Sequence, residues 1–314
     1  MENNAEVRAA PLVVVKDWIT VVRLPFHTVG IFPIVLGTVL AVRAGVQLRV
    51  DVLAAGLVVV ISVMLATYLL GEHFDFEVDR LSAQLERNRF SGGTQALQAG
   101  RIDRRHPIYV SLAALLVGGV AGGYAVAATR ELWLLPLGLF GVAAGVFYSV
   151  PPFRWVQRGI GEVLIGVCYG WLPVAVGFLL QTGEFSWRVS LISVPVALTI
   201  FNVILINEIP DEPADSQMGK RNLVVRFGRE AASYLYAVVA ALTAASLLLL
   251  VYFFSPRGLA NWMVAGLLSA LAVCLATAMA AGVWRTRDAL EKLCGLSIVL
   301  NLSATVALMF ICTA

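Results

Sequence analysis

Two groups of acidic residues with one spacing stand 136 residues apart in a chain that is otherwise strongly apolar. The first, G-E-H-F-D-F-E-V-D, runs from Gly71 to Asp79, and the second, N-E-I-P-D-E-P-A-D, runs from Asn207 to Asp215. Both follow directly on a long apolar segment. Carboxylates at the end of a membrane span are unfavourable unless something pairs with them. A polyvalent cation is the obvious partner, and a cation held by acids usually holds phosphate as well.

The acidic residues share a helix face in each group. At about 100° per residue, Glu72, Asp75 and Asp79 fall on one side of a helix. The second group makes a similar face, although Pro210 and Pro213 are expected to kink or end its helix. Carboxylates three and four residues apart repel each other as a bare pair, so a shared cation would explain them. The alternative is that each group starts a solvated loop and its acids form salt bridges.

Mg²⁺ is the leading candidate for that cation. It takes oxygen ligands and is commonly held by one or two carboxylates together with substrate phosphates. The His and Cys ligands of a structural zinc site are missing from the set. Basic residues suited to phosphate follow each group. They include Arg80, Arg87 and Arg89 before the F-S-G-G-T segment 90–94, and Lys220 with Arg221 after the second group.

Composition identifies a membrane protein. The chain has 314 residues, of which 59% are hydrophobic and only 14% are charged, whereas a soluble domain carries about a quarter charged residues. The net charge of +3 is too small to indicate a nucleic-acid partner. Runs long enough to cross a bilayer as helices are expected to be about 17–25 residues long. Nine such runs are predicted: Leu24–Val42, Val52–Gly71, Pro107–Thr129, Leu132–Phe153, Val163–Gln181, Val189–Ile206, Ala231–Ser255, Ala260–Val283 and Leu293–Ala314.

The distribution of Lys and Arg predicts the orientation of these spans. Of the 23 such residues, 18 lie in the N-terminal tail and in the loops after spans 2, 4, 6 and 8. Positive residues mark the cytoplasmic side, so the pattern indicates an N-inside, C-outside topology with both acidic groups in the cytoplasm. The groups end spans 2 and 6. We therefore predict one all-α membrane domain, 1–314, with four-helix pseudo-repeats at about 24–153 and 163–283 and a ninth helix, 293–314, around a central cavity.

The chain resembles the UbiA superfamily of membrane prenyltransferases. The family carries the motifs N-D-x-x-D-x-x-x-D and D-x-x-x-D on cytoplasmic loops of a nine-helix bundle. Here they correspond to Asp75 with Asp79, and to Asn207 with Asp211 and Asp215. Segment 220–228, K-R-N-L-V-V-R-F-G, is similar to the family's G-K-R-T-L-x-V-R-x-G. Further similar segments are R-L-P at 23–25, P-I-V-L-G-T at 33–38, Y-S-V-P-P at 148–152 and G-I-G-E at 159–162.

Other segments resemble the branch that prenylates 1,4-dihydroxy-2-naphthoate for menaquinone. They are F-S-G-G at 90–93, G-R-I at 100–102 and Q-T-G at 181–183. Three positions depart from the family pattern. Gly71 stands where Asn is usual, Glu72 where Asp is frequent, and Val156 where many members have Lys. The first motif therefore lacks one metal or phosphate contact, or takes it from elsewhere.

The resemblance implies Mg²⁺-dependent transfer of a polyprenyl group from its diphosphate to a small, aromatic acceptor. Asp75, Asp79, Asp211 and Asp215, assisted by Asn207, would hold two Mg²⁺ ions bridged by the substrate diphosphate. Lys220 and Arg221, with one or more of Arg87, Arg89 and Arg154, would neutralise the leaving group. Tyr148 would face the allylic cation or contact the diphosphate, and Arg23 would orient the acceptor. The expected setting is the cytoplasmic (inner) membrane, with the lipid bilayer as the surroundings and no protein partner.

Three alternatives share these residues. A terpene cyclase of the same superfamily would use the same ionisation without an acceptor. The acceptor itself could instead be 4-hydroxybenzoate, homogentisate, a haem or chlorophyll precursor, or a glycerol phosphate. A transporter would use the acids for ion coupling, but acids at span ends rather than at mid-span count against it.

Overall fold

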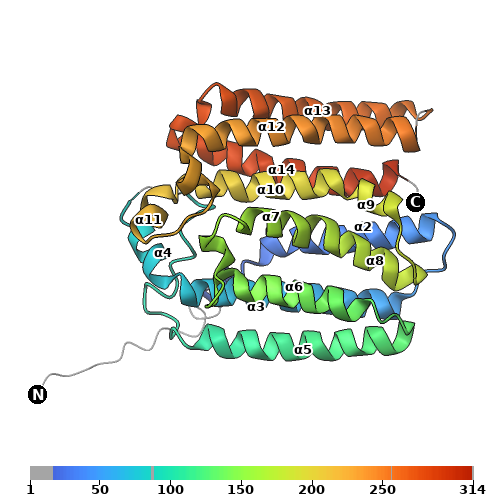
Figure 1. Ribbon diagram of the computed structural model, residues 1–314, viewed down its shortest axis with the longest axis horizontal. Coiled ribbons are helices and arrows are strands. Elements are labelled where there is room, and N and C mark those ends of the chain that lie inside the picture. The colour runs from blue at the N-terminus through green and yellow to red at the C-terminus, as the bar shows by residue number, and fades with distance from the viewer. Residues whose placement is uncertain (1–16, 86–87, 256, 313–314) are drawn as a thin grey trace, which may run out of the picture.

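The structure is a computed structural model that covers residues 17–85, 88–255 and 257–312, and it is built from helices joined by loops. Eight of these helices are long and apolar enough to cross a membrane. Together with a ninth, shorter one they lie side by side (Figure 1). The elements are η1 (Leu24–His27), α2 (Thr28–Arg43), α3 (Val50–Phe74), α4 (Phe76–Ser82), α5 (His106–Thr129), α6 (Leu134–Ser149), η2 (Trp155–Gln157), α7 (Gly161–Ile165), η3 (Gly166–Trp171), α8 (Leu172–Thr182), α9 (Trp187–Ile192), α10 (Val194–Glu208), α11 (Glu212–Gln217), α12 (Leu223–Phe254), α13 (Leu259–Ala280), η4 (Val283–Arg285) and α14 (Arg287–Ile311).

Among the described residues, eight of the nine predicted spans overlap helices long enough to cross a membrane, with ends that differ by several residues, and the fourth does not. Span 4 was expected over Leu132–Phe153, but α6 covers only Leu134–Ser149, 16 residues. Leu132 and Trp133 belong to a turn, and the helix ends shortly before Pro151 and Pro152, which cannot supply helical hydrogen-bond donors. At about 1.5 Å per residue, α6 alone is shorter than the hydrocarbon thickness of a bilayer.

The backbones of α2 and α8 approach each other closely at two glycines. A Cβ added to Gly177 on α8 would lie 2.2 Å from the carbonyl oxygen of Ile34 on α2. One added to Gly37 on α2 would lie 2.0 Å from the carbonyl oxygen of Val174. Small residues at such crossings let membrane helices pack against each other at short range. These two glycines therefore fix α2 against α8.

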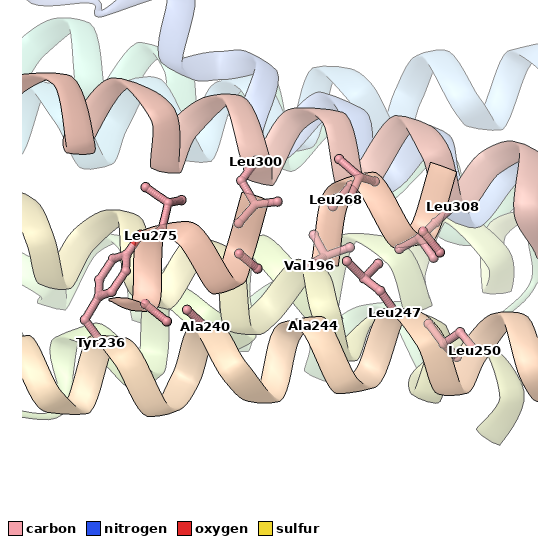
Figure 2. Packing of buried hydrophobic residues seen from close by; sticks show 14 of the residues in the cluster. Val196, Tyr236, Ala240, Ala244, Leu247, Leu250, Leu268, Leu275, Leu300 and Leu308 are labelled. Carbon is pink, nitrogen blue, oxygen red and sulfur yellow. The ribbon is translucent and has the colours of Figure 1, made fainter. Parts of the chain in front are cut away.

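The largest apolar core lies on the other side of the bundle, between α10, α12, α13 and α14. Figure 2 shows leucines from three of these helices interdigitating around Val196, Ala240 and Ala244. Tyr236 is 1% exposed, and its hydroxyl pairs with Ser297 Oγ at 2.6 Å. This core packs against α10, whose C-terminal end carries the second acidic motif.

Candidate active site

The two acidic motifs lie where a long helix gives way to a short one. α3 ends at Phe74, Asp75 stands at the junction, and α4 carries Asp79. The second motif repeats this arrangement, since α10 ends at Glu208 and α11 begins at Glu212. α4 packs against α11, so both motifs meet at one end of the bundle (Figure 1). The helix break predicted for the second motif is present, and the first motif has one as well.

The ammonium group of Lys220 lies between the two motifs. Its Nζ is 3.4 Å from Asp75 Oδ1 and 3.2 Å from Asp215 Oδ1, and the residue is only 7% exposed. The second carboxylate oxygen of each aspartate has its own donor. Ser149 Oγ donates to Asp75 at 3.2 Å, and Asn222 Nδ2 donates to Asp215 at 2.8 Å. Residues that are far apart in the sequence are thus joined around one buried cation.

A loop formed by residues 88–95, here called the glycine loop, contacts both motifs. The backbone N–H of Gly92 donates to Asp211 Oδ2 at 3.2 Å. Gly93, at a φ of 63°, approaches Asp79 so closely that an added Cβ would lie 2.1 Å from Oδ2 of that residue. Thr94 donates to Glu72 from its backbone N–H at 3.1 Å and from its hydroxyl at 2.8 Å. The Gly-Gly pair thus brings the backbone of the glycine loop against the carboxylate groups of Asp211 and Asp79.

Burial controls the protonation of Asp211. It raises the pKa of this carboxyl group to about 6, and the neighbouring charge of Asp215 contributes to the rise. The Gly92 N–H, the ammonium of Lys220 and the hydroxyl of Ser82, which donates at 3.0 Å, act in the opposite direction. Asp211 therefore changes charge close to physiological pH.

The other buried charges follow the same principle. Burial raises the pKa of Asp79 well above its usual range, and the charges of Asp75 and Glu72 raise it further. Burial also raises the pKa of Asp215, against the influence of Lys220. For Lys220 burial alone would lower the pKa, but the surrounding aspartates outweigh it and raise the pKa. The lysine is therefore a fixed positive charge among carboxyl groups of variable charge.

Glu72 has a different role from the one its helical position suggests. Its carboxylate accepts Arg23 Nη2 at 3.0 Å as well as the two donors of Thr94, and the residue is 2% exposed. Its oxygens are therefore already paired within the protein. Arg23 retains a buried Nε with no partner, and it lies beside the ring of Tyr68, 6.0 Å from the centroid. Glu72 thus holds Arg23 in place on the cavity wall.

The remaining predicted basic residues are not all brought to the motifs. Arg89 lines the cavity and pairs with Glu291 on α14 at 2.9 Å. Arg154 and Arg221 are absent from the cavity wall, and Arg221 is exposed. Its backbone holds the neighbouring segments, donating to Gln157 and accepting from Arg226. Arg87 lies outside the described residues.

Tyr148 and Asn207 both line the cavity. Asn207 carries a buried Oδ1 without a hydrogen-bond partner, as does the adjacent Glu208 at Oε2. Glu162, in the G-I-G-E segment, is fully buried and accepts the backbone N–H of Leu223 at 2.6 Å. The sequence singled out that segment but assigned Glu162 no role. It helps to hold the first turn of α12, just after Lys220.

The motifs close the polar end of a cavity of about 1050 Å³. The wall beyond them is apolar and rich in small residues, which come from α3, α5, α6 and the α7–α8 segment. They include Val59 and Val63 on α3, Gly119 and Gly123 on α5, and Gly138 on α6. An acidic mouth with an apolar interior of this size suits a ligand with an anionic head and a long apolar tail.

The donor chemistry of the mouth fits a hard cation such as Mg²⁺. Four aspartates converge there, and the buried amide oxygen of Asn207 is without a partner. Among residues 17–85, 88–255 and 257–312, no three His, Cys, Asp or Glu side chains are positioned to hold a metal by themselves. Mg²⁺ is commonly bound by one or two carboxylates together with substrate phosphates.

Long apolar helices surround a cavity with an acidic mouth and an apolar interior, an arrangement that suits a membrane-embedded enzyme. The sequence pattern of the UbiA prenyltransferase family matches residues 30–304. The chain belongs to this family of prenyltransferases, as its motifs had indicated.

Curated relatives share part of their length with this chain. It is 29% identical over 212 residues to a 1,4-dihydroxy-2-naphthoate octaprenyltransferase of Bacillus subtilis, covering 67% of this chain and 65% of that protein. It is 25% identical over 224 residues to a 2-carboxy-1,4-naphthoquinone phytyltransferase of Synechocystis, covering 69% of this chain and 68% of the relative. The matched region thus spans about two thirds of each relative.

Solved structures share the fold over nearly the whole chain. A digeranylgeranylglyceryl phosphate synthase superposes with a TM-score of 0.67 at 14% identity, covering 95% of this chain and 98% of the other. A UbiA homologue from Archaeoglobus fulgidus, bound to GPP and Mg²⁺, superposes with a TM-score of 0.62 at 15% identity, covering 93% and 99%. At such identities the likeness concerns the fold.

Proposed function

We propose that this enzyme transfers a polyprenyl group from its diphosphate, with Mg²⁺, to 1,4-dihydroxy-2-naphthoate or a similar quinone precursor. The observation that carries the proposal is the convergence of four aspartates and Lys220 at the polar end of an otherwise apolar cavity. The names of the two curated relatives support a naphthoate-type acceptor. The Mg²⁺ and GPP bound by a homologue of the same fold support the donor and the metal.

In this proposal the two motifs hold the donor's head. Asp75, Asp79, Asp211 and Asp215 would hold two Mg²⁺ ions bridged by the diphosphate, with Asn207 assisting. Bound Mg²⁺ supplies positive charge to the diphosphate oxygens as the leaving group departs. Lys220 is positioned to add its own charge there. Of the predicted arginines we retain Arg23 and Arg89, which line the cavity, whereas Arg154 and Arg221 are not part of its wall.

The chain's other side chains shape the transfer. Tyr148 presents an aromatic face to the allylic carbon as the C–O bond breaks. The apolar wall excludes water, which would otherwise capture that carbon. Arg23, with its unpartnered Nε, orients the acceptor. The new carbon–carbon bond then forms between the allylic carbon and a ring carbon of the acceptor, and the ring regains its aromaticity by losing the substituent at that carbon, as H⁺ or as CO₂.

The membrane arrangement is part of the same proposal. We propose nine spans in the cytoplasmic membrane, with α6 as the short fourth one, the N-terminus inside and the C-terminus outside. Two four-helix repeats would each end their second span in an acidic motif. The alternating Lys and Arg content supports this topology. Cysteine-accessibility labelling of the loop at 183–186 and of the loop at 100–105 from either side of the membrane would test it.

The direct test is turnover of a labelled prenyl diphosphate by membranes that contain the protein, with and without EDTA. We expect transfer to stop on chelation and in the variants Asp75→Asn and Asp211→Asn. Asp51→Asn is the matched control, because Asp51 lies at the opposite end of α3 and pairs with Arg49. Mass spectrometry with a panel of acceptors identifies the product. Transfer that survives chelation and both variants would contradict the proposal, as would a hydrocarbon product formed without acceptor.

A further inference from the structure

Two phenol groups lie on the cavity wall beyond the acidic mouth. Tyr68 on α3 and Tyr169 on η3 both line the cavity and belong to one apolar cluster. Around them pack Met64, Ile165 and Ile200. Hydroxyl groups in such surroundings usually have a hydrogen-bonding purpose. The mechanism above uses neither of them.

Tyr169 reaches this position through a local change in helix geometry. The chain between α7 and α8 winds as a π-helix over Gly166–Trp171. A Cβ added to Gly170 would lie 2.3 Å from Ala197 Cα, so the segment is pressed against α10 on one side. Tyr169 lines the cavity on the other. π-Helices are rare, and those that occur are frequently found at functional sites.

Arg23 adds a cation to the same wall. Its guanidinium lies 6.0 Å from the centre of the Tyr68 ring, and Glu72 holds it through Nη2. Its Nε is buried and without a partner. A buried donor left unpaired is unfavourable, and a ligand oxygen would relieve it. One side of the cavity thus combines an unused guanidinium donor with phenolic hydroxyls.

The spacing along α3 separates the tyrosines from the acidic motifs by the length that an acceptor ring would need. Tyr68 precedes Asp75 by seven residues, which corresponds to about 10 Å along a helix. That separation leaves room for a diphosphate at the motifs and for an aromatic ring beside the tyrosines. The tyrosines therefore lie where the acceptor, rather than the donor's head, would be expected.

We propose that Tyr68 and Tyr169 bind a phenolic hydroxyl of the acceptor, next to a carboxylate taken by Arg23, and so select hydroxyaryl carboxylates over their deoxy analogues. This inference rests on the proposed function, whose acceptor subsite it specifies. A site that hydrogen-bonds a substrate hydroxyl discriminates strongly against the analogue that lacks it, because its own polar groups are then left unpaired.

Equilibrium binding tests the selection without turnover. The purified full-length protein would be titrated with 1-hydroxy-2-naphthoate and with 2-naphthoate, in the presence of Mg²⁺ and inorganic diphosphate. We expect the hydroxylated ligand to bind about tenfold more tightly, as one added hydrogen bond provides. Tyr169→Phe and Tyr68→Phe should bring the ratio close to one while leaving 2-naphthoate binding unchanged.

Tyr124→Phe is the matched control, since its hydroxyl pairs with Asp51 on the far part of α3 and is remote from the motifs. Its ratio should equal that of the unmodified protein, and a thermal melt of each variant reports its folding. A ratio that persists in both folded test variants would overturn the inference alone. Failure of both ligands to bind the unmodified protein would overturn the acceptor proposal and this inference together.

Discussion

Asp211 has a carboxyl group whose charge is sensitive to pH near neutrality. With a pKa raised to about 6, it is mostly ionised at pH 7.5 and mostly protonated at pH 5. Only the ionised form can hold a cation. We therefore expect kcat/KM for the prenyl diphosphate to fall as the pH drops below about 6, approaching tenfold per pH unit. A pH–rate profile measured at fixed ionic strength would show this break.

Ser82 provides the control for that assignment. Its hydroxyl donates to Asp211 Oδ1 at 3.0 Å and thereby favours the ionised carboxylate. Ser82→Ala should move the acidic break to higher pH without changing the plateau rate by more than a few-fold. A profile that is flat from pH 5 to pH 8, or a break that Ser82→Ala leaves in place, would exclude Asp211 as its origin.

Gly93 is expected to be intolerant of any side chain. Ala at this position would bring a Cβ within 2.1 Å of Asp79 Oδ2, at a backbone φ of 63°. Because the glycine loop would have to move away from the motif, Gly93→Ala should lower transfer activity by at least tenfold. Gly100→Ala is the matched control, since Gly100 has a φ of 69° but open space around its Cβ position. Equal losses in the two variants would mean that backbone strain, rather than the contact with Asp79, is responsible.

Among the helices, the pair α2 and α8 depends most closely on small residues. Gly177→Ala would place a Cβ 2.2 Å from the backbone oxygen of Ile34, so the two helices would have to separate. Overpacking of this kind costs about 1–3 kcal/mol. A lower unfolding temperature in detergent is the expected result. Gly266→Ala on α13 has open space and should be neutral or slightly stabilising; a similar loss there would contradict the explanation.

The sequence predicts those features that depend on residues close together along the chain. Hydropathy located the long helices, and the repeated spacing located both acidic motifs. Prediction failed where contacts across the fold decide the outcome. The ion pair of Glu72 with Arg23 and the place of Lys220 between two aspartates depend on helix packing that no spacing encodes. The six-residue π-helix lies below the length at which periodicity is informative, whereas α6 was located and only its ends were misplaced.

For the molecule as a whole, cavity volume should determine which prenyl chains are accepted. Gly138 on α6 lines the apolar interior and has open space beside it. Gly138→Leu would place an apolar side chain in that space, so transfer from long prenyl diphosphates should fall several-fold while transfer from geranyl diphosphate is retained. Chromatography of the lipid products would show the change. Gly266→Leu, outside the cavity wall, should leave the chain-length profile unaltered.

Lys220 lies between Asp75 and Asp215, so the carboxylates of the site are already paired with a cation of the protein itself. A divalent cation that binds alone must compete with the Lys220 ammonium for these carboxylates. A divalent cation that binds together with diphosphate supplies a new anion with which the ammonium can pair. Chelation should therefore stop catalysis yet leave the melting temperature unchanged. In Lys220→Met, Mg²⁺ alone should raise the melting temperature, and the absence of such a rise would contradict this competition. Added metal would then stabilise the fold only in the variant that lacks the Lys220 ammonium.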